Sequence, residues 1–549
     1  MLKKSRLIIS ALDQFPQIKH NGEILYKYIL GVGEEYNGEF VSINDQKRLN
    51  EIAEYLRNEY ANWIYSLNEF FVEENLVYEE KLSLFFLTDL SCKRTELFPT
   101  YDDICNLLLI TEKLKNIDVD IVEVYGASEA FKKALFSKLG NRVLKFHSGT
   151  QKKGSTLNRG LWRWGCGTLI FFCKHAITSI LARIKPGKKE SSSECERMFL
   201  TRYPMHFLDR DSLKEEKYGS LVNEGDMYVA SLLTDGFHQN VSLASYFKYK
   251  KKLEQSKDRV HVLDEYSSLW DVVIVSLKSF SYFFKYKKLI TKKFVFCDID
   301  ITGYIKDELK ISYVRICRLL LCMRIFERFL YRHRCKEFIY YLHEYSYGRA
   351  FSYILSKHHD IVSIGMQHGP ASTRKLLYHL GDGEVALGDN YTKHVPIPQK
   401  VWAEDEHSKW IYEMAGYREV SVMSKTPRLA YLKSITRDPQ GGYILIVPGL
   451  HDGPLVIEFL KKEIENSPDI QYVLKPHPRA AQGQLEQYKF KNLVVSSSPI
   501  VNLLPQAELV VATYSSVAIE ARMLGIPVRL VEIPGQINQS PLIDQSISA

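Results

Sequence analysis

The stretch Tyr443-Ile444-Leu445-Ile446-Val447-Pro448-Gly449 decides the fold of the C-terminal part of the chain. A short apolar run rich in β-branched residues and ended by Pro and Gly is typical of a strand buried on both faces. The residues from Leu455 to Ile464 then have the spacing of a helix. Strands that alternate with helices predict a parallel sheet covered on both faces, which is a Rossmann-like α/β unit. The same pattern continues with predicted strands at 472–474, 493–495, 509–512 and 527–531 and a predicted helix at 517–524.

The chain has 549 residues, which is too many for a single core, so we expect two domains. We place a C-terminal domain at 391–549, because Lys400 to Glu404 and the helix before Gly416 look like its first strand and helix. The N-terminal domain, 1–390, is predicted to be a second and more elaborate α/β unit. Its expected strands are 119–124, 228–233, 294–298, 338–342 and 361–367.

Composition and charge favour a globular cytoplasmic protein. Hydrophobic residues make up 45% of the chain, and the nine cysteines contain no CxxC pair. No secretory signal follows Met1, which together with the cysteine pattern predicts a reduced cytoplasm. The formal net charge of +8 is unevenly placed, because 441–549 holds 8 Lys or Arg against 10 Asp or Glu. A basic insertion is predicted at about 151–200, since 151–189 contains nine Lys or Arg and no acidic residue.

Three short motifs lie where predicted strands end. They are Lys475-Pro476-His477-Pro478-Arg479, Thr513-Tyr514-Ser515-Ser516 with Glu520 beyond it, and Gln367-His368-Gly369-Pro370. Because open α/β sheets bind ligands at the carboxyl ends of their strands, these motifs are at the expected place for a site.

The residue types suit a phosphate-and-ribose pocket. Ser515 and Ser516 at the start of a helix would bind an anion through hydroxyl and backbone N–H groups. His477 would donate to a phosphate oxygen of a leaving nucleotide, and Glu520 would accept from ribose hydroxyls. A His-Pro pair alone is usually a turn, and a Ser-Ser pair alone is usually an N-cap. Because both pairs occur in order on alternating strands and helices, together they favour a ligand-binding site. The predicted donor-binding residues are Gly449, Lys475, His477, Pro478, Arg479, Thr513, Ser515, Ser516 and Glu520.

A family resemblance rests on these residues. Lys475-Pro476-His477-Pro478, Tyr514-Ser515-Ser516-x-x-x-Glu520-Ala521 and Gly525-Ile526-Pro527 together resemble the donor half of bacterial GT-B glycosyltransferases for capsule and O-antigen. Sialyltransferases, polysialyltransferases and Kdo (3-deoxy-octulosonate) transferases hold CMP with an HP motif and an SS or ST motif. With His368-Gly369, the chain also looks like polyol-phosphate polymerases that use CDP-glycerol. Both groups release CMP, so the resemblance, over roughly 390–543, implies a cytidine nucleotide.

The general base is less clearly marked. The sialyltransferase families carry an acidic D/E-D/E-G motif, of which Thr234-Asp235-Gly236 and His451-Asp452-Gly453 are each half, the latter in the wrong domain. Glu344 follows the predicted strand 338–342 and precedes a helix, so it would face the inter-domain cleft and take the acceptor proton. A helix-capping role for Glu344 is an equal alternative. The candidate catalytic residues are Glu344, His477, His368 and Asp235.

Asp298-Ile299-Asp300 is a DxD, which holds a divalent metal in glycosyltransferases of the other major fold. Such a triplet is frequent by chance, and the strand pattern favours GT-B. We therefore expect a metal-independent enzyme without a cofactor.

Two basic segments suggest contact with a membrane or an anionic acceptor. Leu161 to Lys185 mixes Trp, Phe and Leu with Arg163, Lys174 and Arg183, and is too interrupted for a transmembrane helix. It would lie on anionic lipid. A helix from Leu309 to Arg334 would present a second basic face, made of Arg324, Arg328 and Arg332. The alternative for both is a solvated face over a core; no nucleic-acid-binding motif accompanies them.

The sequence thus predicts a GT-B glycosyltransferase at the inner face of the plasma membrane. It would move a CMP-activated acidic sugar, such as Kdo or a sialic-acid-like nonulosonate, onto a lipid-linked surface polysaccharide or lipopolysaccharide. The alternatives are a CDP-polyol phosphotransferase, a transferase that uses a UDP- or GDP-sugar, and a non-catalytic glycan-assembly protein.

Overall fold

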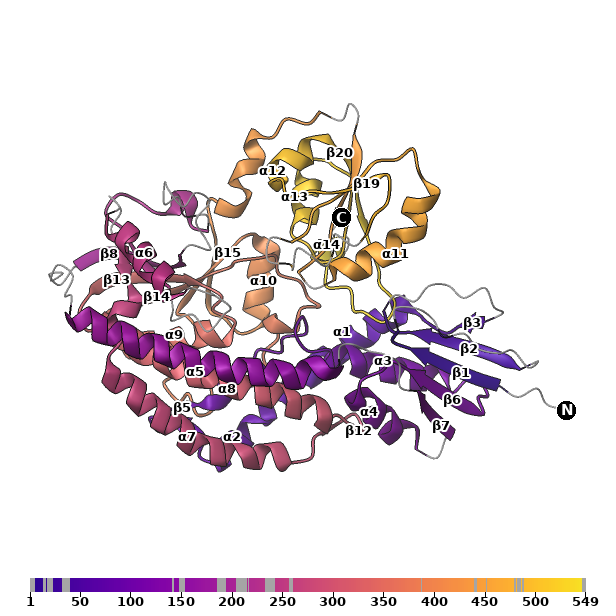
Figure 1. Ribbon diagram of the computed structural model, residues 1–549, viewed down its shortest axis with the longest axis horizontal. Coiled ribbons are helices and arrows are strands. Elements are labelled where there is room, and N and C mark those ends of the chain that lie inside the picture. Colours follow the sequence, from indigo (N-terminus) through magenta and orange to yellow (C-terminus); the bar gives the residue numbers. More distant parts are fainter. Residues whose placement is uncertain are drawn as a thin grey trace.

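The computed structural model describes residues 5–12, 16, 23–31, 40–140, 143–147, 154–184, 194–203, 215, 217–232, 242–255, 260–386, 388–438, 442–450, 452–477, 480, 485 and 488–545. At 154–165 and 182–184 it describes the helical backbone alone. Within this part of the chain three parallel sheets form an α/β protein in two domains, with the C-terminal domain at the top of Figure 1 and the other two sheets side by side beneath it.

The first sheet has five parallel strands in the order β3-β2-β1-β6-β7. Its central strand β1 is almost entirely buried, as its apolar sequence requires. The predicted strand 119–124 is β6, whereas the strands before it were not predicted. The strands are β1 (Ser5–Ser10), β2 (Ile24–Ile29), β3 (Phe40–Ser42), β6 (Ile121–Tyr125) and β7 (Val143–His147), and the accompanying helices are α1 (Gln46–Ser66), α2 (Asn68–Glu73), α3 (Thr100–Lys113) and α4 (Glu129–Leu139), with the hairpin β4 (Val77–Tyr78) and β5 (Leu82–Ser83) and the 3-10 turn η1 (Leu84–Leu87).

The second, middle sheet has seven parallel strands in the order β10-β9-β8-β13-β14-β15-β16. They are β8 (Glu194–Arg202), β9 (Met227–Ser231), β10 (Val260–Val262), β13 (Arg334–Tyr341), β14 (Val362–Met366), β15 (Lys400–Ala403) and β16 (Glu419–Val422). The helices around this sheet are α5 (Gly154–Ile184), α6 (Leu243–Glu254), α7 (Leu269–Thr291), α8 (Thr302–Leu330), α9 (Ser346–Ser356) and α10 (Glu406–Met414), and its short turns are η2 (Gly219–Leu221), η3 (Leu263–Tyr266) and η4 (Leu376–Tyr378).

Two predictions for this region are corrected. The strand at 400–403 pairs with β14, so it extends the middle sheet and does not open the C-terminal one. The middle sheet therefore continues through Val422, past the boundary expected near 390. The strand predicted at 294–298 is instead a small hairpin of β11 (Val295–Phe296) and β12 (Ile299–Asp300) outside the sheet.

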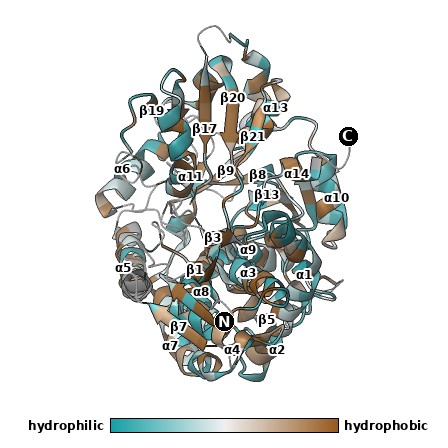
Figure 2. Ribbon diagram, turned by 90° about the vertical axis from the view of Figure 1, so that its right-hand side faces the viewer, coloured by the Kyte–Doolittle hydropathy of each residue, from teal (hydrophilic) through white to brown (hydrophobic). Residues whose placement is uncertain are grey.

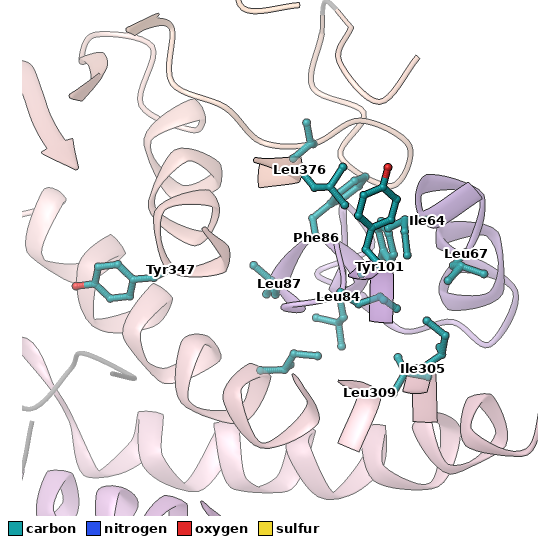
Figure 3. Packing of buried hydrophobic residues seen from close by; sticks show 14 of the residues in the cluster. Ile64, Leu67, Leu84, Phe86, Leu87, Tyr101, Ile305, Leu309, Tyr347 and Leu376 are labelled. Atoms are coloured by element: carbon teal, nitrogen blue, oxygen red, sulfur yellow. The ribbon is translucent and has the colours of Figure 1, made fainter. Parts of the chain in front are cut away.

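One continuous core joins the first and middle sheets. It contains side chains from the first sheet, from α1 and α3 and from α8, α9 and β13, so these elements form a single N-terminal domain. Leu84 and Leu87 of η1 lie between Ile305 and Leu309 of α8 on one side and Leu376 on the other (Figure 3). Large-to-small changes here would cost about 2–5 kcal/mol each.

The C-terminal domain is a five-stranded parallel sheet in the order β19-β18-β17-β20-β21. Alternate residues of β17 enter cores on opposite faces: Leu445 packs on one face and Ile446 on the other. The strands are apolar along most of their length (Figure 2), which confirms the prediction from the sequence. The elements are β17 (Tyr443–Val447), α11 (Gly453–Asn466), β18 (Tyr472–Leu474), β19 (Leu493–Val495), α12 (Ile500–Leu503), η7 (Leu504–Gln506), β20 (Ala507–Ala512), α13 (Val517–Met523) and β21 (Val528–Leu530).

Two segments connect the domains. The turn η5 (Pro427–Ser434) leads from β16 into the C-terminal sheet, and residues 531–545 leave β21 and return to the N-terminal domain, ending in α14 (Leu542–Gln545). This returning segment is held through the backbone oxygens of Gly535 and Gln536, which accept from Asn106 and Gln46 at 2.8 and 2.5 Å. The two domains are therefore fixed to each other at two places.

Candidate functional site

Two of the three predicted motifs, at 475–479 and 513–516, begin at one edge of the C-terminal sheet, together with the loop after β17; the third, at 367–370, follows β14 of the middle sheet. Strands β18, β17 and β20 are neighbours and parallel, so their carboxyl ends lie side by side. Lys475 follows β18, Gly449 follows β17 and Thr513 follows β20. Lys475 and Thr513 thus follow strands of one sheet, as expected, while the site role of these motifs stays a prediction.

The loops after β17 and β20 are locked together. The Thr513 hydroxyl lies 3.3 Å from the backbone N of Gly449, whose N–H donates to it, and it donates in turn to the Asp452 carboxylate at 2.5 Å. A Cβ on residue 449 would lie 2.2 Å from the ring of Tyr514, so only glycine permits this approach. Burial raises the pKa of Asp452, while the hydrogen bond from Thr513 acts against the rise.

The loop after β18 carries the His-Pro motif. The backbone N–H of Lys475 donates to the carbonyl of Ile446 in β17 at 2.9 Å, which continues the sheet. The Lys475 ammonium donates to the Ser497 carbonyl at 3.1 Å, and partial burial lowers its pKa. His477 is half-buried, and its carbonyl accepts from the N–H of Ala480 in a tight turn. Pro478 and Arg479 lie outside the described residues.

The Ser-Ser motif stands at the start of α13. Ser516 is the residue before the helix and makes no side-chain cap, while the Ser515 hydroxyl accepts weakly from Val517 N–H at 3.4 Å. Both serines are half-buried, and the Ser516 hydroxyl lies 3.4 Å from a carboxylate oxygen of Glu520. The hydroxyls thus lie at the same sheet edge as Lys475.

Glu520 is held by the linker between the domains. Its buried carboxylate accepts from Arg428 at 2.9 Å and from the Tyr431 hydroxyl at 2.5 Å. Arg428 also binds both oxygens of Glu404 in the N-terminal domain, at 2.9 and 2.7 Å. A ribose hydroxyl would therefore have to replace Arg428 or Tyr431 to reach Glu520. The predicted ribose contact stays a prediction.

A cavity of about 130 Å³ lies between the domains at this edge of the C-terminal sheet. The C-terminal domain supplies Asp452, Thr513 and Tyr514 from the two locked loops. The returning segment closes one side, and Gln539 donates to Thr95 across it at 2.9 Å. The lining residues are Thr95, Glu96, Asp102, Asp452, Leu455, Thr513, Tyr514, Val531, Glu532, Ile533, Gln536, Ile537, Asn538 and Gln539.

The N-terminal wall of the cavity holds two carboxyl groups in different surroundings. Glu96 is paired with the Arg94 guanidinium at 2.8 Å. Burial raises the pKa of Asp102 to about 8, and the neighbouring Asp103 adds to the rise. At pH 7 Asp102 is therefore mainly protonated and can donate a hydrogen bond. Glu96 and Asp102 were not predicted; their sequence surroundings carry no motif.

Asp452 corrects an assumption made from the sequence. His451-Asp452-Gly453 was set aside as half of an acidic motif in the wrong domain. The structure places Asp452 on the wall of the inter-domain cavity, so its domain does not exclude it from the site. Asp235, the other half-motif, lies outside the described residues.

The middle sheet positions His368 and Glu344 differently from each other. His368 follows β14 and stacks near Tyr341, with ring centroids 6.0 Å apart. Glu344 is buried, accepts from the Tyr412 hydroxyl and lies 3.5 Å from His343. Only 4% of its side chain is exposed. Neither His368 nor Glu344 lines the cavity. Their catalytic roles stay predictions.

Two arginines of the basic face predicted on α8 are half-buried and bind inside the protein, and Arg332 is exposed. Arg324 and Arg328 both bind the buried carboxylate of Asp271 at the start of α7, at 3.0 and 2.8 Å. The guanidinium of Arg332, just beyond the helix, lies over the Tyr266 ring at 5.9 Å. The structure therefore uses Arg324 and Arg328 to hold α7 against α8, and we no longer expect them to contact an acceptor. On α5, Lys174 is half-buried, and the side chains of Arg163 and Arg183 lie outside the described part.

No protein-family model matches the sequence, and no curated protein is significantly similar to it. Solved structures that match include the glycotransferase of kitacinnamycin (11% identity, 65% of this chain and 84% of that chain, TM-score 0.34). Another is CalG4, the calicheamicin glycosyltransferase (12% identity, covering 65% of this chain and 83% of that chain, TM-score 0.35). A third is the wall teichoic acid polymerase TagF (11% identity, covering 67% of this chain and 78% of that chain, TM-score 0.29).

The assignment of the fold rests on the sheets themselves. Parallel α/β sheets on both sides of an inter-domain cavity agree with the predicted GT-B architecture of two Rossmann-like domains, with an additional first sheet in the N-terminal domain.

Proposed function

We propose that this chain is a glycosyltransferase that binds a nucleotide-activated donor at the strand ends of the C-terminal sheet. The observation that carries the proposal is the cavity between the domains, whose walls include Thr513 and Tyr514 of a predicted donor motif. Neighbouring loops supply Lys475, His477, Ser515 and Ser516 at the same sheet edge. Hydrogen-bond donors that are preorganised around a leaving phosphate are usually the largest contribution to the rate enhancement of such a transfer.

The nucleotide is proposed to be a cytidine nucleotide, and the sugar an acidic one such as Kdo or a nonulosonate. The support is the pairing of His-Pro and Ser-Ser motifs. The acceptor is proposed to be a lipid-linked surface glycan at the inner face of the plasma membrane. A CDP-polyol donor uses the same nucleotide and remains the second candidate.

Proton transfer from the acceptor is proposed to occur at the N-terminal wall of the cavity. Glu96, paired with Arg94, is a carboxylate that can accept the hydroxyl proton, while protonated Asp102 can donate to a neighbouring acceptor oxygen. Glu344 and His368 remain the alternatives from the sequence.

The transfer is proposed to need no divalent metal. The Asp300 carboxylate of the DxD accepts from Thr302 N–H at 3.0 Å at the start of α8, and Asp298 is exposed on the hairpin turn. Neither residue lines the cavity. Complete loss of turnover with a chelator, restored by Mg²⁺ or Mn²⁺, would contradict this.

A nucleotide screen by thermal shift tests the proposal. A ligand at 100 times its Kd stabilises the folded state by about 2.7 kcal/mol. CMP and CDP should raise Tm more than UDP and GDP at equal concentration, and Gly449→Ala should remove most of the rise. A clear preference for UDP or GDP would favour the UDP/GDP-sugar alternative. No response to any nucleotide would favour the non-catalytic one.

A further inference from the structure

Helix α7 has a row of large apolar side chains that face solvent. Trp270, Leu277, Phe280 and Phe284 are 69%, 67%, 66% and 56% exposed. They recur at intervals of three, four or seven residues, so they lie on one face of the helix. The opposite face packs inward through Val275, Tyr282, Tyr286 and Leu289. Val273 and Phe283 widen the exposed row.

Helix α5 adds a second exposed apolar row beside it. Leu169 and Ile170 are 65% and 53% exposed, and Ile177, Ile180 and Leu181 continue the row. The other face of α5 is buried through Thr168, Phe171, His175, Thr178 and Ser179. This orientation makes α5 part of the domain, not an appended segment.

The two helices lie next to each other on the side of the molecule opposite the C-terminal domain (Figure 1). The Ser179 hydroxyl of α5 lies 3.0 Å from that of Ser267, just before α7. Ile180 and Leu181 therefore lie near the start of α7, where the exposed row of that helix begins. We call the exposed apolar side chains of both helices the α5–α7 face. Exposed apolar surface on two neighbouring helices is typical of an interaction site.

The charges of these two helices indicate which kind of partner binds the α5–α7 face. Their 54 residues, 31 in α5 and 23 in α7, include eight Lys or Arg and one acidic residue. That residue, Asp271, is buried and bound to Arg324 and Arg328, so no carboxylate of either helix faces outward. Among the lysines of α7, Lys288 is paired with Glu74 at 3.0 Å, and Lys278 lies over the Tyr78 ring. Lys287 carries a further positive charge on the same stretch.

We propose that the α5–α7 face docks this protein on an anionic lipid bilayer, with both helices lying in the headgroup region. Anionic lipid surfaces bind an apolar row flanked by cations, and the one carboxylate of these two helices, Asp271, is buried. Among the described residues, none of the helices combines the length and the apolar character of a membrane span. Relative to the sequence prediction for 161–185, the proposal adds α7 and makes apolar side chains the main contact. It agrees with the proposed function by bringing the enzyme to a lipid-linked acceptor, but it does not depend on it.

Vesicle flotation of the full chain tests the proposal. The protein should float with phosphatidylglycerol–phosphatidylcholine vesicles at low salt and less at high salt. The triple variant Leu277→Ser/Phe280→Ser/Phe284→Ser removes three exposed side chains, so it should bind at least about tenfold more weakly. Phe459→Ser, which changes an exposed aromatic of the C-terminal domain, should float like the wild type. Lys287→Glu should weaken binding to the anionic vesicles without affecting Tm.

Several outcomes would overturn the docking face. They are a wild-type protein that ignores these vesicles at low salt, a triple variant that floats unchanged, and a dimer in solution that the triple variant dissociates without any vesicle binding. Nucleotide-dependent thermal shifts should be the same in all four proteins. A failure of lipid binding with those shifts intact would reject the docking face and leave the proposed function standing.

Discussion

The imidazole Nε2 of His407 lies 3.2 Å from a carboxylate oxygen of Asp544, and this contact ties the middle sheet to the last helix of the described chain. The same carboxylate accepts from the hydroxyl and the backbone N–H of Thr373, at 2.5 and 2.8 Å. Three contacts on one carboxylate fix the end of the returning segment that closes the cavity.

The pair should make stability depend on pH in a defined window. The hydrogen bond to Asp544 raises the pKa of His407 against the effect of burial. For Asp544, burial would raise the pKa, but the bonds from His407 and Thr373 lower it overall. The raised pKa of His407 contributes to the free energy of unfolding below about pH 6.5, and this contribution is lost as pH rises through the pKa of the folded state. The lowered pKa of Asp544 contributes above about pH 3.9, and this contribution is lost as pH falls through the pKa of the folded state.

His407→Gln should therefore destabilise the protein by roughly 0.5–1 kcal/mol near pH 5.5 and much less near pH 8.5. Thermal denaturation at both pH values measures this. His359→Gln, which changes an exposed histidine, is the matched control and should have little effect at either pH. An equal loss at both pH values for His407→Gln would mean that the ion pair does not form.

His477→Ala should lower kcat strongly while the fold survives. The half-buried histidine would donate to the leaving phosphate, so its contribution belongs to the transition state. Loss of one such donor typically costs about 10²–10³ in kcat. Steady-state kinetics with an unchanged Tm would support the role. A well-folded variant with near wild-type turnover would leave His477 as a turn residue.

Gly449→Ala tests the lock between the loops after β17 and β20. The new Cβ would lie 2.2 Å from the Tyr514 ring, so the ring or the loop has to move. The cost is expected to be about 1–3 kcal/mol, as for other overpacked sites. Nucleotide binding should weaken along with stability, as measured by calorimetry and thermal shift. Gly383→Ala is a control in an open turn with no atom near the added Cβ, where only the positive φ of 77° would cost stability. If Gly449→Ala bound nucleotide normally, the lock would not shape the site.

Glu96→Gln and Glu344→Gln separate two positions for the base. Loss of a general base usually lowers turnover by about 10²–10⁴. We expect this loss for Glu96→Gln, with donor binding and Tm preserved, because Glu96 lines the cavity. For Glu344→Gln we expect mainly lower stability, because its buried carboxylate is bonded to Tyr412. A stable Glu344→Gln protein without turnover, beside an active Glu96→Gln protein, would reverse the assignment.

The parts of the fold that could be predicted are those with local signals. The run at 443–447 is buried on both faces and ends in Pro and Gly, so its strand and the neighbouring ones could be recognised. Strand β15 could be recognised as a strand but not assigned to its sheet. Its partner β14 is identified by pairing of Ile364 with Lys400, a contact that no local pattern records.

The residues of the site also fall into those that could be predicted from local sequence and those that could not. Thr513, Ser515 and Lys475 follow strands, so their meeting at one sheet edge could be predicted. The opposite wall could not, because Glu96 and Asp102 reach the cavity through tertiary packing. The arginines of α8 show the converse: Arg324 has regular helical spacing with Arg328, yet their partner Asp271 lies 53 residues before Arg324.

The returning segment also determines when the site can form during synthesis. Gln46 and Gln536 are joined across 490 residues, and Asn50 meets Asn538 across 488. Contacts of such separation form late, because the chain between them must first be made and ordered. The ribosome will have produced every strand of the three sheets before residues 531–539 emerge, and this segment then adds Val531, Ile533 and Ile537 to their cores. A nascent chain stalled shortly before this segment would therefore hold folded sheets but no closed cavity, and could not yet bind a donor between its domains.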